Sequence, residues 1–294
     1  MQSIPNRDPE RAYDAIGVTY ETSCPDYTTH LQDVLTKVTD DLVPGSKVLD
    51  IGCGTGKPAA FHFVNKGHDV IGIDISQKMV DVASSQVPEA KFFKADMTAF
   101  QPPEAGNYDA VIASHSLYYL SLGQLRMMIY RFSHWVKQGG IVLVGSSLKA
   151  EAIEQQTLKF DRRGWAEGVE GSFLGHKFDY TYGLVDAWRV LLQDAGLEVI
   201  DVDQRHCTPV GSDKKDSHIA FFMTTRKIVD NALLGPHPVP RVLPDPLSLE
   251  YIDSSVSADF EQRIARKEIS AIVDLVKNGG YKKVLVIGSG AQGI

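Results

Sequence analysis

The segment 47-KVLDIGCGTG-56 decides the fold that we expect for this chain. KVLDI is a short apolar run, which is typical of a strand buried on both faces of a parallel sheet. Gly52, Gly54 and Gly56 follow directly, and glycine at such positions lets the backbone adopt positive φ and approach a ligand closely. Alone, the turn would also suit a tight strand–helix connection that binds nothing.

Helix-like and strand-like segments alternate on both sides of this turn. A helix with one apolar face is expected over 25–42, and Pro44-Gly45 ends it. Ser76 is expected to cap another helix. The further strands are expected at 68–74, 90–96, 108–114, 139–147, 197–204 and 217–227, and the further helices at 58–66, 76–86, 120–136 and 184–195. This alternation predicts an α/β fold with a doubly wound, Rossmann-like sheet.

Composition and charge indicate an ordinary globular protein without a polyanion-binding face. The chain has 294 residues, of which 43% are hydrophobic and 23% charged, and its formal net charge is −7. Basic residues cluster only in pairs such as Lys214-Lys215, so we expect no nucleic-acid partner. No apolar run reaches about 18 residues, and the N-terminus lacks a signal-peptide pattern. We therefore expect no membrane partner and a cytoplasmic location.

The cysteines give no sign of a disulfide framework or a metal site. Cys24, Cys53 and Cys207 are scattered along the chain, and an odd set of this kind is typical of reduced thiols. The sequence contains no Cys-x-x-Cys pair and no His/Cys spacing suited to zinc, so no metal is expected.

Three aspartates, Asp50, Asp74 and Asp96, stand at the ends of the first three expected strands. Because ligands bind at the carboxyl edge of such sheets, the three side chains are candidates for one site. Asp74 could accept two hydrogen bonds from a ribose diol, and Asp96 could accept an adenine amino proton. Asp50 directly precedes the glycines, where it would oppose a pyrophosphate but suit an ammonium group. For each aspartate, the alternative is a plain helix-capping role.

A nicotinamide-dependent oxidoreductase is a competing interpretation. Asp74 fits it, since a carboxylate at that strand end also binds the ribose of a dinucleotide. Asp50 and Asp96 do not fit it. The glycine spacing differs as well, because the third glycine of a GxGxxG fingerprint would come one residue after Gly56.

The segments VLDIGCGTG, VIGIDIS, FFKADM, YDAVIASHSLYYL and GGIVLV resemble the successive motifs of class I S-adenosylmethionine-dependent methyltransferases, over about residues 10–227. The resemblance implies a seven-stranded sheet of order 3-2-1-4-5-7-6, with the last strand antiparallel, and S-adenosyl-L-methionine as cofactor. It assigns the methionine moiety to Asp50 and the glycine turn, the ribose to Asp74, and the adenine to Asp96 with Met97. The cofactor contacts expected in all are Tyr20, Asp50, Gly52, Cys53, Gly54, Gly56, Asp74, Ile75, Asp96, Met97 and Ser114.

The likeness extends to small-molecule methyltransferases of secondary metabolism, including fungal tailoring enzymes. The fourth strand ends in ASHSLYY, which departs from the Asn/Asp-Pro-Pro-Tyr of nucleic-acid amino-methyltransferases. The resemblance therefore implies methyl transfer to an O or N atom, less readily C or S, of a small organic metabolite. The alternative is a protein that binds the cofactor without methylating, as a scaffold or as the catalyst of another reaction.

His115, directly after the fourth strand, is the candidate catalytic residue. Its imidazole could act as a base toward a hydroxyl or amine at neutral pH, or it could shape the pocket by hydrogen bonding. Tyr20 belongs to YDAIGVTYE (13–21), which resembles the segment that closes over the cofactor in related enzymes. Its ring could face the sulfonium, or it could anchor the segment.

The remaining segments predict the domain organisation. The stretch 150–182 is expected to be an insertion with one helix. The resemblance implies that this insertion lies where family members build a substrate lid. Residues 1–227 then form the methyltransferase domain, and 228–250, with five prolines from Pro236 to Pro246, form a linker. Residues 251–294 repeat the helix–strand–glycine pattern and end in KKVLVIGSGAQGI. We interpret them as the truncated start of a second Rossmann-like domain, or alternatively as a tail that packs on the first domain or on another subunit. The oligomeric state stays open.

Overall fold

The computed structural model describes residues 8–23, 25–149, 158–208 and 218–229 of the chain. The predicted tail, residues 251–294, lies outside this described part. The predicted linker, 228–250, lies outside it too, except for its first two residues.

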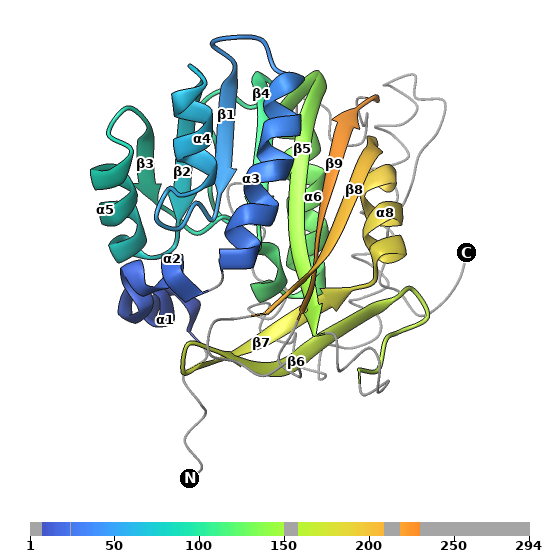
Figure 1. Cartoon of the computed structure of the whole chain (residues 1–294). Helices are drawn as coiled ribbons and strands as arrows, with labels where there is room; N and C mark the ends of the chain where they lie inside the picture. The colour runs from blue at the N-terminus through green and yellow to red at the C-terminus, as the bar shows by residue number, and fades with distance from the viewer. Residues whose placement is uncertain (1–7, 24, 150–157, 209–217, 230–294) are drawn as a thin grey trace, which may run out of the picture. The chain divides into compact units, whose positions relative to one another are not determined.

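A seven-stranded sheet forms the centre of the described part (Figure 1). Its strands follow the order β3-β2-β1-β4-β5-β9-β8. The first five are parallel, β9 runs antiparallel to β5, and β8 runs antiparallel to β9. The predicted order is therefore confirmed, since β6 and β7 belong to a separate sheet. The strands are β1 (Lys47–Ile51), β2 (Asp69–Asp74), β3 (Lys91–Lys94), β4 (Tyr108–Ser114), β5 (Val136–Lys149), β8 (Leu197–Cys207) and β9 (His218–Lys227).

Helices cover both faces of this sheet (Figure 1). One face carries α3 (Pro25–Asp40) and α4 (Ala59–Asn65), and the other carries α6 (Leu122–Trp135) and α8 (Val185–Asp194). Helix α5 (Gln77–Gln86) packs against β2 and β3. The central strands are therefore covered on both faces, which explains their continuous apolar sequences.

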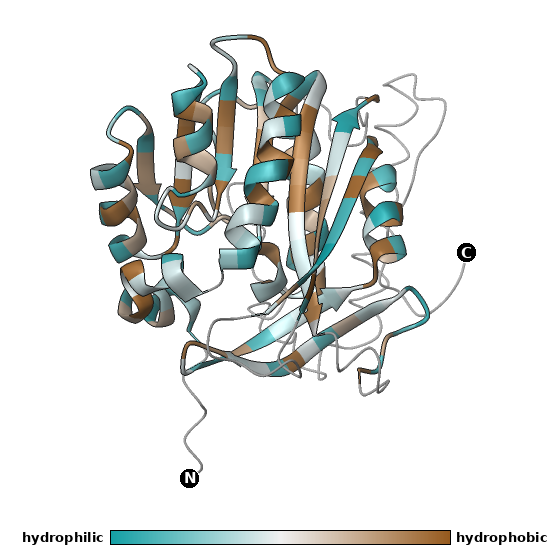
Figure 2. Ribbon diagram, in the orientation of Figure 1, coloured by the Kyte–Doolittle hydropathy of each residue, from teal (hydrophilic) through white to brown (hydrophobic). Residues whose placement is uncertain are grey.

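Each face of the sheet has its own hydrophobic core. Successive side chains of β1 point to opposite faces, so Val48 packs with α3 and α4 whereas Leu49 and Ile51 pack with α6. Hydrophobic residues accordingly concentrate on the strands and on the sheet-facing sides of the helices (Figure 2). In the described residues, no helix combines the length and apolar character needed to cross a membrane.

Side-chain caps set the starts of α1 (Pro9–Ile16), α5 and α6, the last by a capping box of Ser121 and Gln124. The Ser76 hydroxyl accepts a hydrogen bond from the Met79 amide at 3.1 Å, so the predicted cap of α5 is confirmed. At the N-terminus, the Asp8 carboxylate caps α1, a helix that the sequence analysis did not predict. The turn η1 (Gly17–Thr19) and α2 (Tyr20–Ser23) follow it. Helix α1 packs on α5, and its residues reach the carboxyl edge of the sheet.

The predicted insertion at 150–182 contains a hairpin in its described residues. Strand β6 (Trp165–Phe173) pairs with β7 (His176–Gly183), while residues 150–157 lie outside the described part. Phe178, Tyr180 and Tyr182 alternate along β7 and are buried. An aromatic residue at every second position buries one side of a strand, which explains why this stretch is extended.

Candidate functional site

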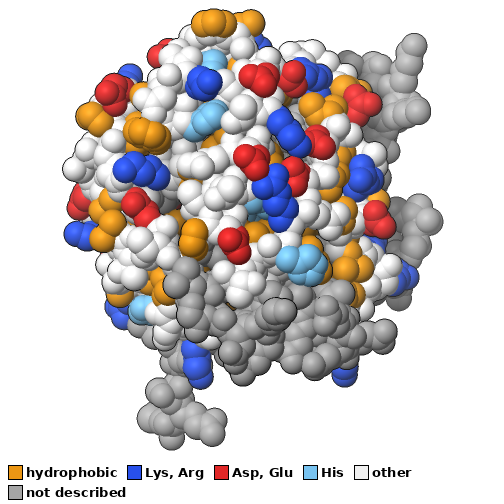
Figure 3. Space-filling view, viewed as in Figure 1, with side chains coloured by type: hydrophobic (Ala, Val, Ile, Leu, Met, Phe, Trp, Pro, Cys, Tyr) orange, Lys and Arg blue, Asp and Glu red, His pale blue; other side chains and the backbone are white. Residues whose placement is uncertain are grey.

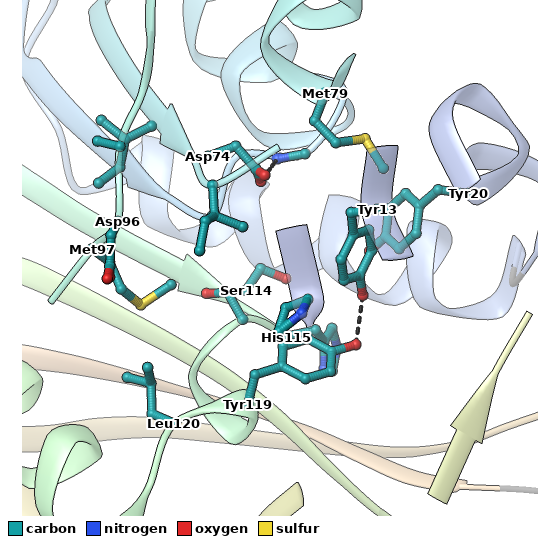
Figure 4. Close-up of a pocket in the computed structure, with 17 residues that line it drawn as sticks. Tyr13, Tyr20, Asp74, Met79, Asp96, Met97, Ser114, His115, Tyr119 and Leu120 are labelled. Atoms are coloured by element: carbon teal, nitrogen blue, oxygen red, sulfur yellow. Dashed lines mark hydrogen bonds between the residues drawn. The ribbon is translucent and has the colours of Figure 1, made fainter. Parts of the chain in front are cut away.

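A cavity lies at the carboxyl edge of the sheet (Figure 4). Residues that follow β1, β2, β3 and β4 line it together with residues of α1 and α2. The structure thus brings together many of the predicted residues, namely Tyr20, Gly52, Gly54, Asp74, Ile75, Asp96, Met97, Ser114 and His115. The sequence analysis did not single out the other lining residues, which are Pro9, Tyr13, Ile73, Met79, Ala95, Ser116, Tyr119 and Leu120.

The glycine turn after β1 presents its backbone to this cavity. Gly52 and Gly54 have φ values of 73° and 53°, a region that other residues rarely adopt. A Cβ atom at Gly52 would lie 2.4 Å from the Ser116 Cβ, whereas one at Gly54 would meet nothing within 4 Å. The Gly52 position is therefore closed by packing, and the Gly54 backbone faces open space.

Asp74 connects the glycine turn to the start of α5. Its Oδ2 accepts a hydrogen bond from the Gly54 amide at 2.9 Å, and its Oδ1 accepts one from the Ser76 amide at 2.9 Å. Burial raises the pKa of this carboxyl group, and the two backbone donors act in the opposite direction. A carboxylate has about four lone-pair sites, so both oxygens keep the capacity to accept a bond from a ligand diol.

The loop after β3 carries Asp96 and Met97. Asp96 Oδ1 accepts bonds from the amide and the hydroxyl of Thr98, both at 2.8 Å, which forms a local turn. Arg131 of α6 donates to the carbonyl oxygens of Met97 at 3.3 Å, Thr98 at 2.6 Å, and Phe100. This buried guanidinium therefore holds the loop against the sheet, with Asp96 and Met97 at the cavity (Figure 4).

Three predicted cofactor residues do not line the cavity: Asp50, Cys53 and Gly56. Gly56 has a φ of 80°, and a Cβ there would lie 3.3 Å from each of three side chains, those of Ala83, Val87 and Phe92. Its position is therefore a packing requirement between the turn and α5. Cys53 is buried beneath the turn, and burial raises its thiol pKa well above the ordinary value.

Asp50 lies behind the glycine turn and is only 2% exposed. Among the described residues, its Oδ2 has no hydrogen-bond partner. Burial, with a smaller contribution from the charge of Asp74, raises the pKa of Asp50 to about 7. An orphaned buried carboxylate oxygen is costly unless a ligand or water satisfies it. Together with the open backbone at Gly54 and the free acceptor capacity of Asp74, it fits the ammonium and ribose groups of the predicted cofactor.

A second cavity adjoins the first. Four side chains line both cavities: Tyr13, Tyr20, His115 and Tyr119. Figure 4 shows Tyr13 and Tyr119 facing each other, and their hydroxyl oxygens lie 2.5 Å apart. The other side chains of the second cavity come from the N-terminal helices, the segment after β4, β5, the β6–β7 hairpin and β9. They are Ser23, Tyr27, Thr28, Tyr118, Ser147, Ser172, Phe173, Tyr180, Tyr182 and His218.

His115 stands at the boundary of the two cavities in a strained conformation. Its φ of 53° is uncommon for a residue other than glycine, and such strain is often found at functional sites. Its ring packs edge-on against Tyr27 and Phe222, with centroid distances of 4.6 and 5.1 Å. Within the described part, neither ring nitrogen has a hydrogen-bond partner. Burial, reinforced by His30 and His218, lowers the pKa of His115 to about 3, so the imidazole is neutral near pH 7.

Residues 48–140 match a protein-family model described as a methyltransferase domain. Phosphoethanolamine N-methyltransferase 3 of Arabidopsis thaliana is 28% identical over 56% of this chain and 31% of its own length. Magnesium-protoporphyrin O-methyltransferase of Rhodobacter capsulatus is 35% identical over 29% of this chain and 38% of its own length. The chain thus spans about a third of the length of these two relatives. An 18S rRNA (guanine-N(7))-methyltransferase of Schizosaccharomyces pombe is 26% identical over 68% of this chain and 80% of its own length.

Solved structures share the fold. A Listeria monocytogenes protein described as a putative S-adenosylmethionine-dependent methyltransferase superposes with a TM-score of 0.53 and 19% identity, over 68% of this chain and 98% of that one. The [4+2]-cyclase SpnF superposes with a TM-score of 0.50 and 22% identity, over 68% of this chain and 81% of that one. The family match, the strand order and the site at the carboxyl edge agree with one another. Residues 48–140 of this chain are therefore similar to a methyltransferase domain, and the described part has the seven-stranded, Rossmann-like fold of the solved methyltransferases.

Proposed function

We propose that this chain transfers a methyl group from S-adenosyl-L-methionine to an O or N atom of a small organic metabolite. The observation that carries the proposal is the shared lining of the two cavities by Tyr13, Tyr20, His115 and Tyr119. A cofactor in the first cavity and an acceptor in the second would therefore meet at these side chains. The cofactor supplies a methyl group that is activated by its attachment to a sulfonium.

The residues that line the first cavity, together with Asp50 behind the glycine turn, have distinct roles in this proposal. Asp50 pairs with the ammonium of the methionine moiety, and the Gly54 backbone allows that moiety to approach. Asp74 accepts hydrogen bonds from the ribose, while Asp96 and Met97 hold the adenine. The Tyr20 ring lies at the cavity boundary, where an aromatic face favours a cation.

His115 has a modified role in this proposal. An imidazole whose pKa is about 3 is a weak base, so it does not take a full proton from a neutral hydroxyl before methyl transfer. The ring nitrogen that carries no proton can instead accept a hydrogen bond from the acceptor group and orient it. Alignment of two reactants in a site closed to water can contribute roughly 7–11 kcal/mol to the rate, and the methyl donor needs little other activation.

A small acceptor suits the second cavity and the surface of the described part. Acidic and basic side chains alternate over the face in Figure 3, so this face presents no broad basic surface for RNA. The names of the relatives give different acceptors, an rRNA guanine among them. Secondary metabolism and a cytoplasmic location remain parts of this proposal.

The second candidate is a cofactor-binding catalyst of a different reaction. SpnF favours it, because a protein named as a [4+2]-cyclase has this same fold. S-Adenosylhomocysteine discriminates the two candidates, since only methyl transfer releases it.

The test combines calorimetry with product analysis. We expect the chain to bind S-adenosylmethionine and not NAD, and to release S-adenosylhomocysteine when a metabolite pool is supplied. Asp74→Ala should weaken cofactor binding by about 2–3 kcal/mol because a buried charged acceptor is lost. Asp81→Ala, on the outer face of α5, is the matched control and should bind normally. Cofactor binding without S-adenosylhomocysteine release would favour the second candidate, and NAD binding would contradict both.

A further inference from the structure

The walls of the second cavity hold no acidic side chain and no Lys or Arg side chain in the described part of the chain. The ionisable groups of this cavity are phenols and two histidines, and His115 is neutral. Burial raises the pKa values of Tyr118 and Tyr119 well above the ordinary 10, so these hydroxyls stay protonated and act as neutral donors.

Aromatic rings supply the flat surfaces of this cavity. Tyr180 and Tyr182 of β7 stack with an interplanar angle of 17° and a centroid distance of 5.5 Å. Tyr118 meets Tyr180 edge-on at 5.5 Å and Tyr119 at 4.7 Å. Planar ligands stack on such rings or meet them edge-on, and their polar substituents can reach the surrounding hydroxyls.

We propose that the acceptor is an uncharged, planar aromatic molecule that bears a hydroxyl or amine group. This inference rests on the proposed function and specifies its substrate class. Transferring an unpaired carboxylate or phosphate into this aromatic cavity is costly, because no described Lys or Arg side chain there can compensate the charge. A cationic acceptor would be repelled by the adjacent sulfonium, and an ammonium nitrogen has no lone pair to methylate.

Three probes of one size test this charge preference directly. 2-Naphthol is neutral near pH 7, 2-naphthoate is anionic, and 2-naphthylmethylamine is cationic. Each is titrated by calorimetry into the full chain saturated with S-adenosylhomocysteine. We expect 2-naphthol to bind at least about tenfold more tightly than either charged probe, which corresponds to about 1.4 kcal/mol. Equal or tighter binding of a charged probe would overturn the inference, and so would failure of all three to bind.

Ser172 offers a variant that changes the charge without altering the core. It lines the cavity but is exposed on β6, so a longer side chain can be accommodated at the rim. Ser172→Arg should strengthen 2-naphthoate binding by about tenfold and leave 2-naphthol unchanged. Ser172→Gln is the uncharged control and should change neither. No effect of Ser172→Arg on 2-naphthoate would contradict the placement of the probes in this cavity.

The measurement separates this inference from the proposed function. It records binding without turnover, so a preference for 2-naphthol stands even if the chain releases no S-adenosylhomocysteine. Conversely, turnover of a charged metabolite would support the proposed function and overturn the substrate class.

Discussion

The hydroxyl oxygen of Tyr13 in α1 lies 2.5 Å from that of Tyr119 in η2 (Leu117–Tyr119), 106 residues away in the sequence. Both side chains line both cavities. The bond therefore connects the N-terminal helix to the segment after β4, at the point where cofactor and acceptor would meet.

Removing either hydroxyl should weaken the contact between α1 and η2. Tyr13→Phe is expected to weaken cofactor binding about three- to tenfold, the value of one neutral hydrogen bond. Tyr119→Phe should have the same effect, and the double variant should be no weaker than either single one, because both lose the same bond. Calorimetry measures the three constants, and Tyr130→Phe on α6, which lines neither cavity, is the control. Additive effects of the two substitutions would show that the bond does not matter for binding.

Asp50→Asn should separate stability from cofactor binding. The folded-state pKa of Asp50, about 7, lies above the ordinary 3.8, so its ionised form destabilises the folded protein as the pH rises through this range. The amide removes this cost, and we expect the free energy of unfolding to rise by on the order of 1–3 kcal/mol above neutral pH, with the gain vanishing below about pH 4.

Asp50→Asn should bind the cofactor more weakly, although it should be more stable. The amide cannot pair with an ammonium group as a carboxylate does, so we expect binding at least about tenfold weaker. Denaturant titration at several pH values and calorimetry measure the two effects. Unchanged affinity in a folded variant would remove Asp50 from the cofactor site.

The rate of methyl transfer should not change with pH near 6.5 because of His115. A catalytic histidine with an ordinary pKa would instead make the rate fall below about pH 6.5. Because the pKa of His115 is about 3, its protonation state does not change near pH 6.5. His115→Asn keeps a residue that tolerates positive φ and should lower the rate about 10- to 100-fold by loss of one hydrogen bond. A wild-type rate that falls with an apparent pKa near 6.5, together with no such fall in His115→Asn, would show that His115 is a general base.

The same pKa predicts a stability difference. The unfolded chain binds a proton at His115 below about pH 6.5, whereas the folded chain does not until about pH 3. The free energy of unfolding of the wild type therefore falls as the pH drops through this window. His115→Asn lacks this contribution, so its stability relative to the wild type should increase toward acid, as measured by denaturant titration.

Substitution by alanine at Gly54 should mainly weaken cofactor binding, whereas the same substitution at Gly56 should mainly lower stability. A Cβ at Gly54 meets no atom, so Gly54→Ala should lose only about 1–2 kcal/mol of stability from its positive φ, but it should weaken cofactor binding. Gly56→Ala adds contacts at 3.3 Å to the same φ cost and should lose more stability, with little direct effect on the cofactor. Thermal melts and calorimetry on the two variants decide the matter. Equal effects on affinity would contradict the division between a lining and a packing glycine.

Local patterns in the sequence were enough to predict the sheet. The apolar run at Lys47–Ile51 and the Ser76 cap depend on neighbouring residues only, and both are found in the structure. The hairpin of the insertion was not predicted, because it depends on aromatic packing against a distant core. Tyr13 and Tyr119 were missed for the same reason, since only the folded chain brings α1 to η2.

The candidate site was predictable where the strand ends themselves supply the residues. Asp74, Asp96 and the Gly54 backbone lie at the cavity because parallel strands end at one edge. Asp50 and Cys53 lie behind the turn, since the direction of each side chain depends on the local backbone geometry and not on sequence position. Spacing alone could not distinguish Gly56, a packing glycine, from Gly54.

Transfer of a labelled methyl group tests the central claim most directly. The chain is incubated with S-adenosylmethionine that carries a deuterated methyl group, in the presence of a metabolite extract, cellular RNA and protein. Mass spectrometry then follows the label in each fraction. We predict that the label appears in a low-mass product in an amount equal to the S-adenosylhomocysteine released. Label in RNA or protein, or bound cofactor without any S-adenosylhomocysteine, would contradict the account.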